Sequence, residues 1–121
     1  MIDWPTLRSY ALTKTEAYET TPFGPDTAVF KVAGKIFALV PWTNDPLTVS
    51  LKCDPYEATA FRSTYPAVRP GWHLNKRHWN TVTVDGSLPD ELVLEMVDES
   101  YALVVEGLPK TVRLALKERN R

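Results

Sequence analysis

The sequence predicts an α+β fold, with an antiparallel sheet and helices packed on one of its faces. Candidate elements follow the order helix, strands, helix, strand, helix, helix, which is typical of this class. Two apolar runs are joined by the two-residue turn Ala33-Gly34, as in a β-hairpin. The chain has 121 residues, of which 44% are hydrophobic and 24% charged. We therefore expect a single globular domain over residues 1–121 with a core of its own.

The N-terminal half of the chain has the pattern of a helix followed by strands. The helix is expected over residues 4–13, because Asp3 is a good N-cap and proline is tolerated in the first turn at Pro5. Strands are expected over residues 18–21, 28–32, 35–42 and 47–53. In the last strand apolar residues alternate, so we expect one face in the core, formed by Leu47, Val49, Leu51 and Cys53. The other face would meet solvent and consists of Thr48, Ser50 and Lys52.

The C-terminal half returns to helices after one further strand. A helix is expected over residues 55–64, capped by Asp54 and packing through Tyr56, Ala60 and Phe61. A proline-bounded connection then leads to a strand over residues 79–84, whose inward residues would be Asn80, Val82 and Val84. An apolar stripe at helical spacing predicts a helix over residues 89–106, and a short basic helix begins at Pro109.

The net charge of −1 conceals a strong segregation of charge along the chain. Residues 27–84 carry a net charge of +4 and both histidines, whereas residues 85–106 carry seven acidic residues and no basic one. Residues 107–121 return to +4 through a basic tail formed by Lys110, Arg113, Lys117, Arg119 and Arg121. Such a bipolar chain can present one basic face to an anionic partner despite its nearly neutral total, and the tail could extend that face.

The sequence gives no sign of membrane insertion or secretion. No stretch approaches the run of about 20 apolar residues that a spanning helix needs. The N-terminal residues 1–5 lack the basic and apolar regions of a secretory signal. Cys53 is the single cysteine, so no internal disulfide can form, which favours a reducing compartment. We expect a cytoplasmic monomer without a membrane partner.

Residues 69–80 are the densest group of side chains suited to binding. They combine cations, two indoles and side-chain amides in a segment that local propensity leaves irregular, and such loops on a rigid scaffold often carry binding sites. Arg and Lys pair with phosphates, and Trp stacks on bases. The structural alternative makes Trp72 and Trp79 core or rim aromatics, with Lys76 and Arg77 solvated. Both interpretations stay open at this level.

Catalytic and metal-binding patterns are absent from the sequence. His73 and His78 are accompanied by no third histidine, CxxC or HExxH motif, whereas zinc sites need roughly three or four ligands. Cys53 is expected on an inward strand face, where cysteine is usually inert, so a nucleophilic pair would need the fold to bring a histidine to it. The five glycines form no phosphate-binding loop. We expect a protein that is not an enzyme and needs no cofactor or metal.

Several segments have a recognisable pattern when taken together. They are Thr21–Pro25, Lys35–Ala38, Leu51–Pro55, Pro70–Val82, and Ser100–Val105 followed by Leu108–Lys110. The most specific is the run His-Leu-Asn-Lys-Arg-His-Trp-Asn at residues 73–80. These segments resemble the MmcQ/YjbR family over nearly the whole chain. The resemblance implies a CyaY-like α+β fold, which agrees with the element order, and DNA binding through a proposed double-wing arrangement of hairpins.

The leading functional hypothesis is a DNA-binding module with little sequence selectivity. Its basic sheet and loop surface would contact phosphates, and the candidate residues are Lys31, Lys35, Lys52, Arg69, His73, Lys76, Arg77 and Trp79. No predicted helix has the basic, polar face of a major-groove reader. The hypothesis requires folding to bring these distant cations onto one water-facing surface.

The alternative hypothesis is a small adaptor that binds a protein or an anionic ligand. It would use the aromatic and basic cluster at residues 69–80, together with Phe23 and Trp42, because aromatic rings beside cations can form a cleft selective for anions or peptides.

Overall fold

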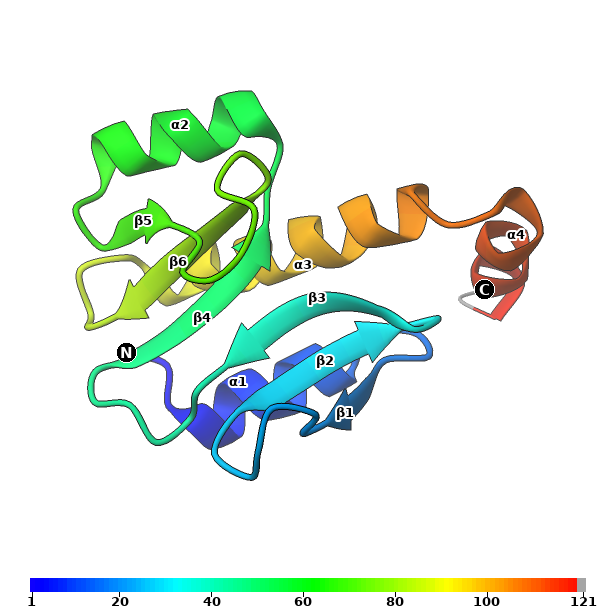
Figure 1. Ribbon diagram of the computed structural model, residues 1–121, viewed down its shortest axis with the longest axis horizontal. Helices are drawn as coiled ribbons and strands as arrows, with labels where there is room; N and C mark the ends of the chain where they lie inside the picture. Colours follow the sequence, from blue (N-terminus) through cyan, green and yellow to red (C-terminus); the bar gives the residue numbers. More distant parts are fainter. Residues whose placement is uncertain (120–121) are drawn as a thin grey trace.

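The computed structural model describes residues 1–119 and contains one antiparallel sheet (Figure 1). Its strands are β1 (Tyr18–Thr20), β2 (Ala28–Val32), β3 (Lys35–Val40), β4 (Leu47–Lys52), β5 (Val68–Pro70) and β6 (Trp79–Val84). They lie in the order β1-β2-β3-β4-β6-β5, so β5 and β1 are the edges. The predicted hairpin turn joins β2 to β3. Its residues Ala33 and Gly34 have φ angles of 48° and 80°, the left-handed pair that a type I′ turn requires.

Helices accompany the sheet at the start, in the middle and at the end of the described chain. They are α1 (Trp4–Leu12), α2 (Pro55–Thr64), α3 (Asp90–Glu106) and α4 (Lys110–Arg119). Figure 1 shows α1 and α3 behind the sheet, α2 beside β5 and β6, and α4 beyond the tip of the β2–β3 hairpin. The predicted caps are confirmed, because Asp3 Oδ1 accepts a hydrogen bond from Thr6 N at 2.9 Å and Asp54 Oδ1 accepts one from Tyr56 N at 3.0 Å. No helix of the described chain is both long and apolar enough to span a membrane.

The hydrophobic core lies between the sheet and the helices behind it. The largest fully buried side chains are those of Phe30 and Phe37, on β2 and β3. Residues from α1, from α3 and from the central strands pack around them, including Leu7, Ala11, Val49, Val82, Val93 and Val97. This arrangement confirms the predicted α+β class, with an antiparallel sheet and helices on one face.

Two expectations about the middle of the chain are wrong in detail. The sequence predicts an irregular connection at residues 68–70, but these residues form the edge strand β5, where Pro70 is tolerated at the end of the strand. The sequence also predicts that Tyr56 and Ala60 pack inward. Instead Ala58 is the buried residue of α2, Ala60 is exposed and Tyr56 is 88% exposed, because α2 turns a different face toward β5.

Ser50 also departs from its predicted place in solvent. It is only 4% exposed, although it lies on the face of β4 away from the core. Its hydroxyl lies 2.8 Å from Thr81 Oγ1 on β6, and side chains of the loop at residues 71–78 line the same hollow. This loop covers part of the sheet face that alternation alone would leave in water.

β3 and β4 separate after a short paired region. They pair through Ala38–Leu39 and Ser50–Leu51. Phe37 and Lys52 would be the next partners, but Ser100 of α3 lies between them. Its hydroxyl accepts a hydrogen bond from Lys52 N at 2.8 Å and donates one to the carbonyl oxygen of Phe37 at 2.6 Å. The Ser100 side chain therefore replaces the direct hydrogen bond between the two strands at this point, and the two strands diverge.

Candidate functional site

Three of the predicted cations line one hollow, at the place where β3 and β4 separate. We call it the lysine hollow, and it is lined by Lys31, Lys35, Lys52 and Trp79, with Gly34, Ile36, Val104 and Gly107 completing its wall. Its volume is about 460 Å³. In the described chain no acidic side chain belongs to this lining. The positive charges thus come together from three consecutive strands, β2, β3 and β4.

Strand register explains why these residues meet. Lys52 and Trp79 are direct partners in the β4–β6 pair, so their side chains lie on the same face of the sheet. On the other side of the hollow, Lys31 is paired with Ile36 across the β2–β3 hairpin, and Lys35 follows the turn at once. The gap between β3 and β4 separates these two groups and forms the hollow between them.

The ammonium groups of the lysine hollow are available to an outside anion. Within residues 1–119 the ion pairs involve other cations, which are the N-terminal amine, Arg8, Lys14 and Arg119. The last turn of α3 lies at the back of the hollow, and the partial negative charge of a helix C-terminus stabilises nearby cations. The helix C-terminus therefore offsets part of the repulsion among the three lysines, although no carboxylate belongs to the lining of the hollow within the described residues.

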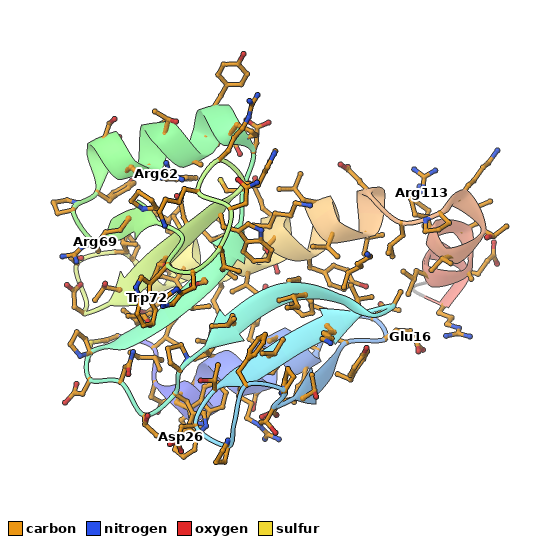
Figure 2. The ribbon with its side chains drawn as sticks, viewed as in Figure 1. Glu16, Asp26, Arg62, Arg69, Trp72 and Arg113 are labelled. Carbon is orange, nitrogen blue, oxygen red and sulfur yellow. The ribbon has the colours of Figure 1, made fainter. Side chains whose placement is uncertain are left out.

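A second hollow, the open-face groove, lies on the sheet face away from α1 and α3. Its volume is about 330 Å³, and its lining includes Phe23, Ile36, Leu39, Thr48, Ser50, Trp72, His73 and Thr81. Ile36 also lines the lysine hollow, so the two sites are adjacent. At the rim, Phe23 is 65% and Trp72 is 69% exposed. Figure 2 shows Trp72 in front of the sheet.

Hydrogen bonds to β6 hold Trp72 in this place. Gly71 N donates to the carbonyl oxygen of Trp79 at 2.8 Å, and Trp72 N donates to Thr81 Oγ1 at 3.1 Å. A Cβ on residue 71 would lie 2.7 Å from the Cβ of Trp79, so only glycine allows this close approach. The adjacent His73 has a φ of 59°, and its ring lies 4.1 Å from that of Trp72. The exposed indole is therefore presented by a tightly constrained backbone.

Arg62 of α2 ties the other end of the same loop. Its Nε donates to Asn80 Oδ1 at 2.6 Å, and its Nη2 donates to the carbonyl oxygens of Lys76 and Trp79. Asn80 is itself buried, and its Nδ2 donates to the carbonyl oxygen of Ala58 at 3.4 Å. Figure 2 shows Arg62 between α2 and this loop. The loop at residues 71–78 is thus anchored to both a helix and a strand.

The remaining predicted cations do not line the lysine hollow. Arg69 is exposed on β5, near the edge of the sheet (Figure 2). Arg77 is exposed in the loop, and the ammonium of Lys76 donates to a carbonyl oxygen of the same loop at 3.0 Å. His73 lines the open-face groove. The predicted binding residues therefore fall into a lysine group, a groove group and separate cations on β5 and in the loop.

Two aromatic residues of the predicted cluster lie apart from the groove. Trp42 stacks on Trp4, with ring centroids 6.3 Å apart, and its Nε1 donates to the carbonyl oxygen of Pro25 at 3.1 Å. Trp79 lines the lysine hollow instead. In the basic tail, Arg119 pairs with Glu16 at 3.0 Å, whereas Arg121 lies outside the described residues.

Cys53 has the properties of a structural thiol. Burial raises its pKa to about 11, with further contributions from the carboxylates of Glu57, Glu99 and Asp54. The thiol is therefore protonated at neutral pH and is a poor nucleophile. Neither histidine ring is hydrogen-bonded to it within residues 1–119, so the nucleophilic pair considered from the sequence is not formed. In the same residues no cluster of three His, Cys, Asp or Glu side chains is arranged to hold a metal ion.

Known proteins share both the sequence and the fold of this chain. The YjbR family model matches residues 12–103. The uncharacterized protein YjbR of Escherichia coli K12 is 38% identical over 110 residues, which cover 91% of this chain and 93% of that protein. The chain belongs to the YjbR family. The family resemblance seen in the sequence is thereby confirmed.

Other YjbR relatives agree with this assignment. The uncharacterized protein YbdF of Escherichia coli O157:H7 is 38% identical over 89 residues, covering 74% of this chain and 73% of that protein. The crystal structure of Deinococcus radiodurans protein DR2400, with a DUF419 domain, has a TM-score of 0.91 and 41% identity, covering 97% of this chain and 89% of its own. A Pseudomonas syringae crystal structure has a TM-score of 0.73 and 26% identity, covering 84% of this chain and 98% of its own. The likeness to the CyaY-like fold stays a prediction.

Proposed function

We propose that this YjbR-family protein is a non-catalytic DNA-binding module that holds backbone phosphates in the lysine hollow. The convergence of Lys31, Lys35 and Lys52, from three different strands, is the observation that carries this proposal. Lysines that neutralise phosphates release condensed counterions, and this release provides most of the affinity of non-specific binding. The hollow lies near the tip of the β2–β3 hairpin, where a phosphate backbone can approach it.

Little sequence selectivity is expected from this site. The lysine hollow offers ammonium groups, which recognise charge, and α1, α2 and α3 present no basic face to a major groove. The basic helix α4 lies beyond the tip of the β2–β3 hairpin, outside the lining of the hollow. The exposed side of α3 is acidic instead, through Glu91, Glu95, Glu99 and Glu106. Because this helix lies behind the sheet, its charge repels DNA from that side and restricts binding to the open face.

The salt dependence of binding tests the proposal. For a short DNA duplex, phosphate contact by three lysines predicts a log–log slope of about −2.7, from about −0.9 for each neutralised phosphate. Raising the salt concentration fourfold should then weaken binding by about 40-fold. Fluorescence anisotropy at two salt concentrations measures this slope. Absence of binding at low salt, or binding that salt leaves unchanged, would refute the proposal.

Two variants of equal charge locate the contact. Lys52→Ala removes one cation from the hollow and should reduce the magnitude of the slope by about 0.9. Arg8→Ala removes one cation from α1, behind the sheet, where the side chain makes a surface ion pair with Glu19. Because such pairs contribute at most about 1 kcal/mol to stability, Arg8→Ala should fold normally and keep the original slope. Equal slopes for the two variants would place DNA elsewhere.

The open-face groove favours a second candidate function, an adaptor for an acidic protein segment or a small anionic ligand. Its volume of about 330 Å³ falls at the lower end of the range for ligand sites, about 300–1,000 Å³, and Trp72 at its rim is exposed. A synthetic acidic peptide with one aromatic residue tests this function. Binding that is lost in Trp72→Ala and kept in Lys52→Ala would favour the adaptor over the DNA-binding module.

A further inference from the structure

The lysine hollow and the open-face groove form one surface with two chemistries. Ile36 lines both, so one extended ligand can occupy the two adjacent hollows at once. The hollow is basic, whereas the groove has aromatic walls at Phe23 and Trp72. An occupant of the whole surface must therefore carry anionic groups beside a flat apolar group.

The floor of the groove is polar, so an occupant should also carry groups that form hydrogen bonds. Thr48, Ser50 and Thr81 place hydroxyls on the same sheet face, and the oxygens of Ser50 and Thr81 are 2.8 Å apart. Thr81 Oγ1 also accepts the hydrogen bond from Trp72 N, at 3.1 Å, so the floor and the indole are fixed relative to each other. Ser50 and Thr81 are thus committed to each other and to the loop, and Thr48 is the hydroxyl of this face that can pair with the polar edge of a heterocycle. A hydroxyl both donates and accepts hydrogen bonds, so it does not select one edge pattern.

We propose that the DNA partner is single-stranded, with an unpaired base in the open-face groove and neighbouring phosphates in the lysine hollow. This inference rests on the proposed phosphate binding and adds that the bound DNA is single-stranded. A single strand has the required pair of groups at adjacent positions, and its bases stack readily on exposed aromatic rings. In a duplex each base is stacked and paired, so a duplex can reach the lysines but leaves the groove empty.

Three probes of equal length separate the two contributions: an oligothymidylate, an abasic deoxyribose-phosphate strand and a duplex. Stacking on one aromatic ring predicts that the wild-type protein binds the oligothymidylate about tenfold more tightly than the abasic strand or the duplex. Trp72→Ala should remove this difference and leave abasic binding unchanged. Trp72→Phe, which keeps a ring, should retain most of it. The indole is 69% exposed, so these variants should fold normally.

A matched control removes an aromatic ring that lines neither hollow. Tyr56 on α2 is 88% exposed, and Tyr56→Ala should leave all affinities unchanged. Lys52→Ala should weaken binding of the oligothymidylate and the abasic strand by the same factor, because it acts only on phosphates.

The two proposals fail in different ways. If all probes bind with equal affinity and depend on Lys52, the single-strand inference is overturned while phosphate binding stands. If Trp72→Ala weakens the abasic strand as much as the oligothymidylate, base stacking is likewise overturned. If Lys52→Ala affects no probe, phosphates are not held in the lysine hollow, and both proposals fall.

Discussion

The backbone N–H of Lys52 donates a 2.8 Å hydrogen bond to the hydroxyl of Ser100, so a side chain of α3 completes the end of β4. The same hydroxyl donates to the carbonyl oxygen of Phe37 at 2.6 Å, and Ser100 is fully buried. The serine thereby satisfies two backbone groups that β3 and β4 would otherwise exchange. Because the strands can separate here without an unpaired polar group, the lysine hollow opens at this position.

Ser100→Ala should destabilise the protein. The variant leaves Lys52 N–H and the Phe37 carbonyl without this partner in a buried position, and we expect the free energy of unfolding to fall by about 1–3 kcal/mol. Urea denaturation measures the change. Ser9→Ala, at an exposed position on α1, is the matched control and should stay within about 0.5 kcal/mol of wild type. Equal stabilities of the two variants would show that the Ser100 bridge contributes nothing.

Gly71→Ala should disturb the loop that carries Trp72. The added Cβ would lie 2.7 Å from the Cβ of Trp79, so the loop must move away from β6. We expect a loss of about 1–3 kcal/mol in the free energy of unfolding, as for other overpacked sites, measured by thermal denaturation. Gly107→Ala provides the control, because its Cβ would meet its nearest neighbour at an ordinary 3.5 Å. A Gly71→Ala protein as stable as the control would mean that the loop moves without cost.

Local sequence signals were sufficient for most of the fold. Asp3 and Asp54 precede prolines at helix starts, and both act as N-caps. Ala33-Gly34 lies between two apolar runs and forms the hairpin turn. Alternation likewise places Lys52 on the outward face of β4. Each of these features depends on residues close together in sequence, which is why pattern and propensity predict them.

Features that depend on contacts between distant segments could not be predicted in this way. Alternation predicts Ser50 in solvent, because it contains no information about the loop that covers part of this face. The meeting of Lys31 with Lys52 depends on strand order and on the irregular register at residues 30–31. Ser100 is detectable in the sequence, because it is a polar residue at a buried position of the α3 stripe, between Val97 and Val104. Its partners, however, come from strands far away in the sequence.

Glu99→Gln should stabilise the protein at neutral pH. Burial and the nearby carboxylate of Glu57 raise the pKa of Glu99 above its ordinary value of 4.5. A carboxyl with a raised pKa in the folded state destabilises the fold once it ionises, so this penalty is absent below pH 4.5 and complete once the pH exceeds the raised pKa. Because Glu99 is only partly buried and solvent screens its charge, we expect a gain of up to about 1 kcal/mol at pH 7.

Urea denaturation of Glu99→Gln at acidic and at neutral pH measures this difference. Glu91→Gln is the matched control, since Glu91 lies in the first turn of α3, where a negative charge is favourable. It should bring no gain in stability at either pH. A gain for Glu99→Gln that is equal at both pH values would show that ionisation of Glu99 is not its cause.

Arg62→Met should loosen the loop at residues 71–78. The variant keeps an aliphatic side chain but loses the donors to the carbonyl oxygens of the loop and to Oδ1 of the buried Asn80. We expect the free energy of unfolding to fall by about 1–3 kcal/mol, with faster amide hydrogen exchange concentrated in the loop. Arg69→Met, at an exposed position of β5, should change stability by less than about 0.5 kcal/mol. If both variants exchange alike, Arg62 does not anchor the loop, and Trp72 is held by its hydrogen bonds to β6 alone.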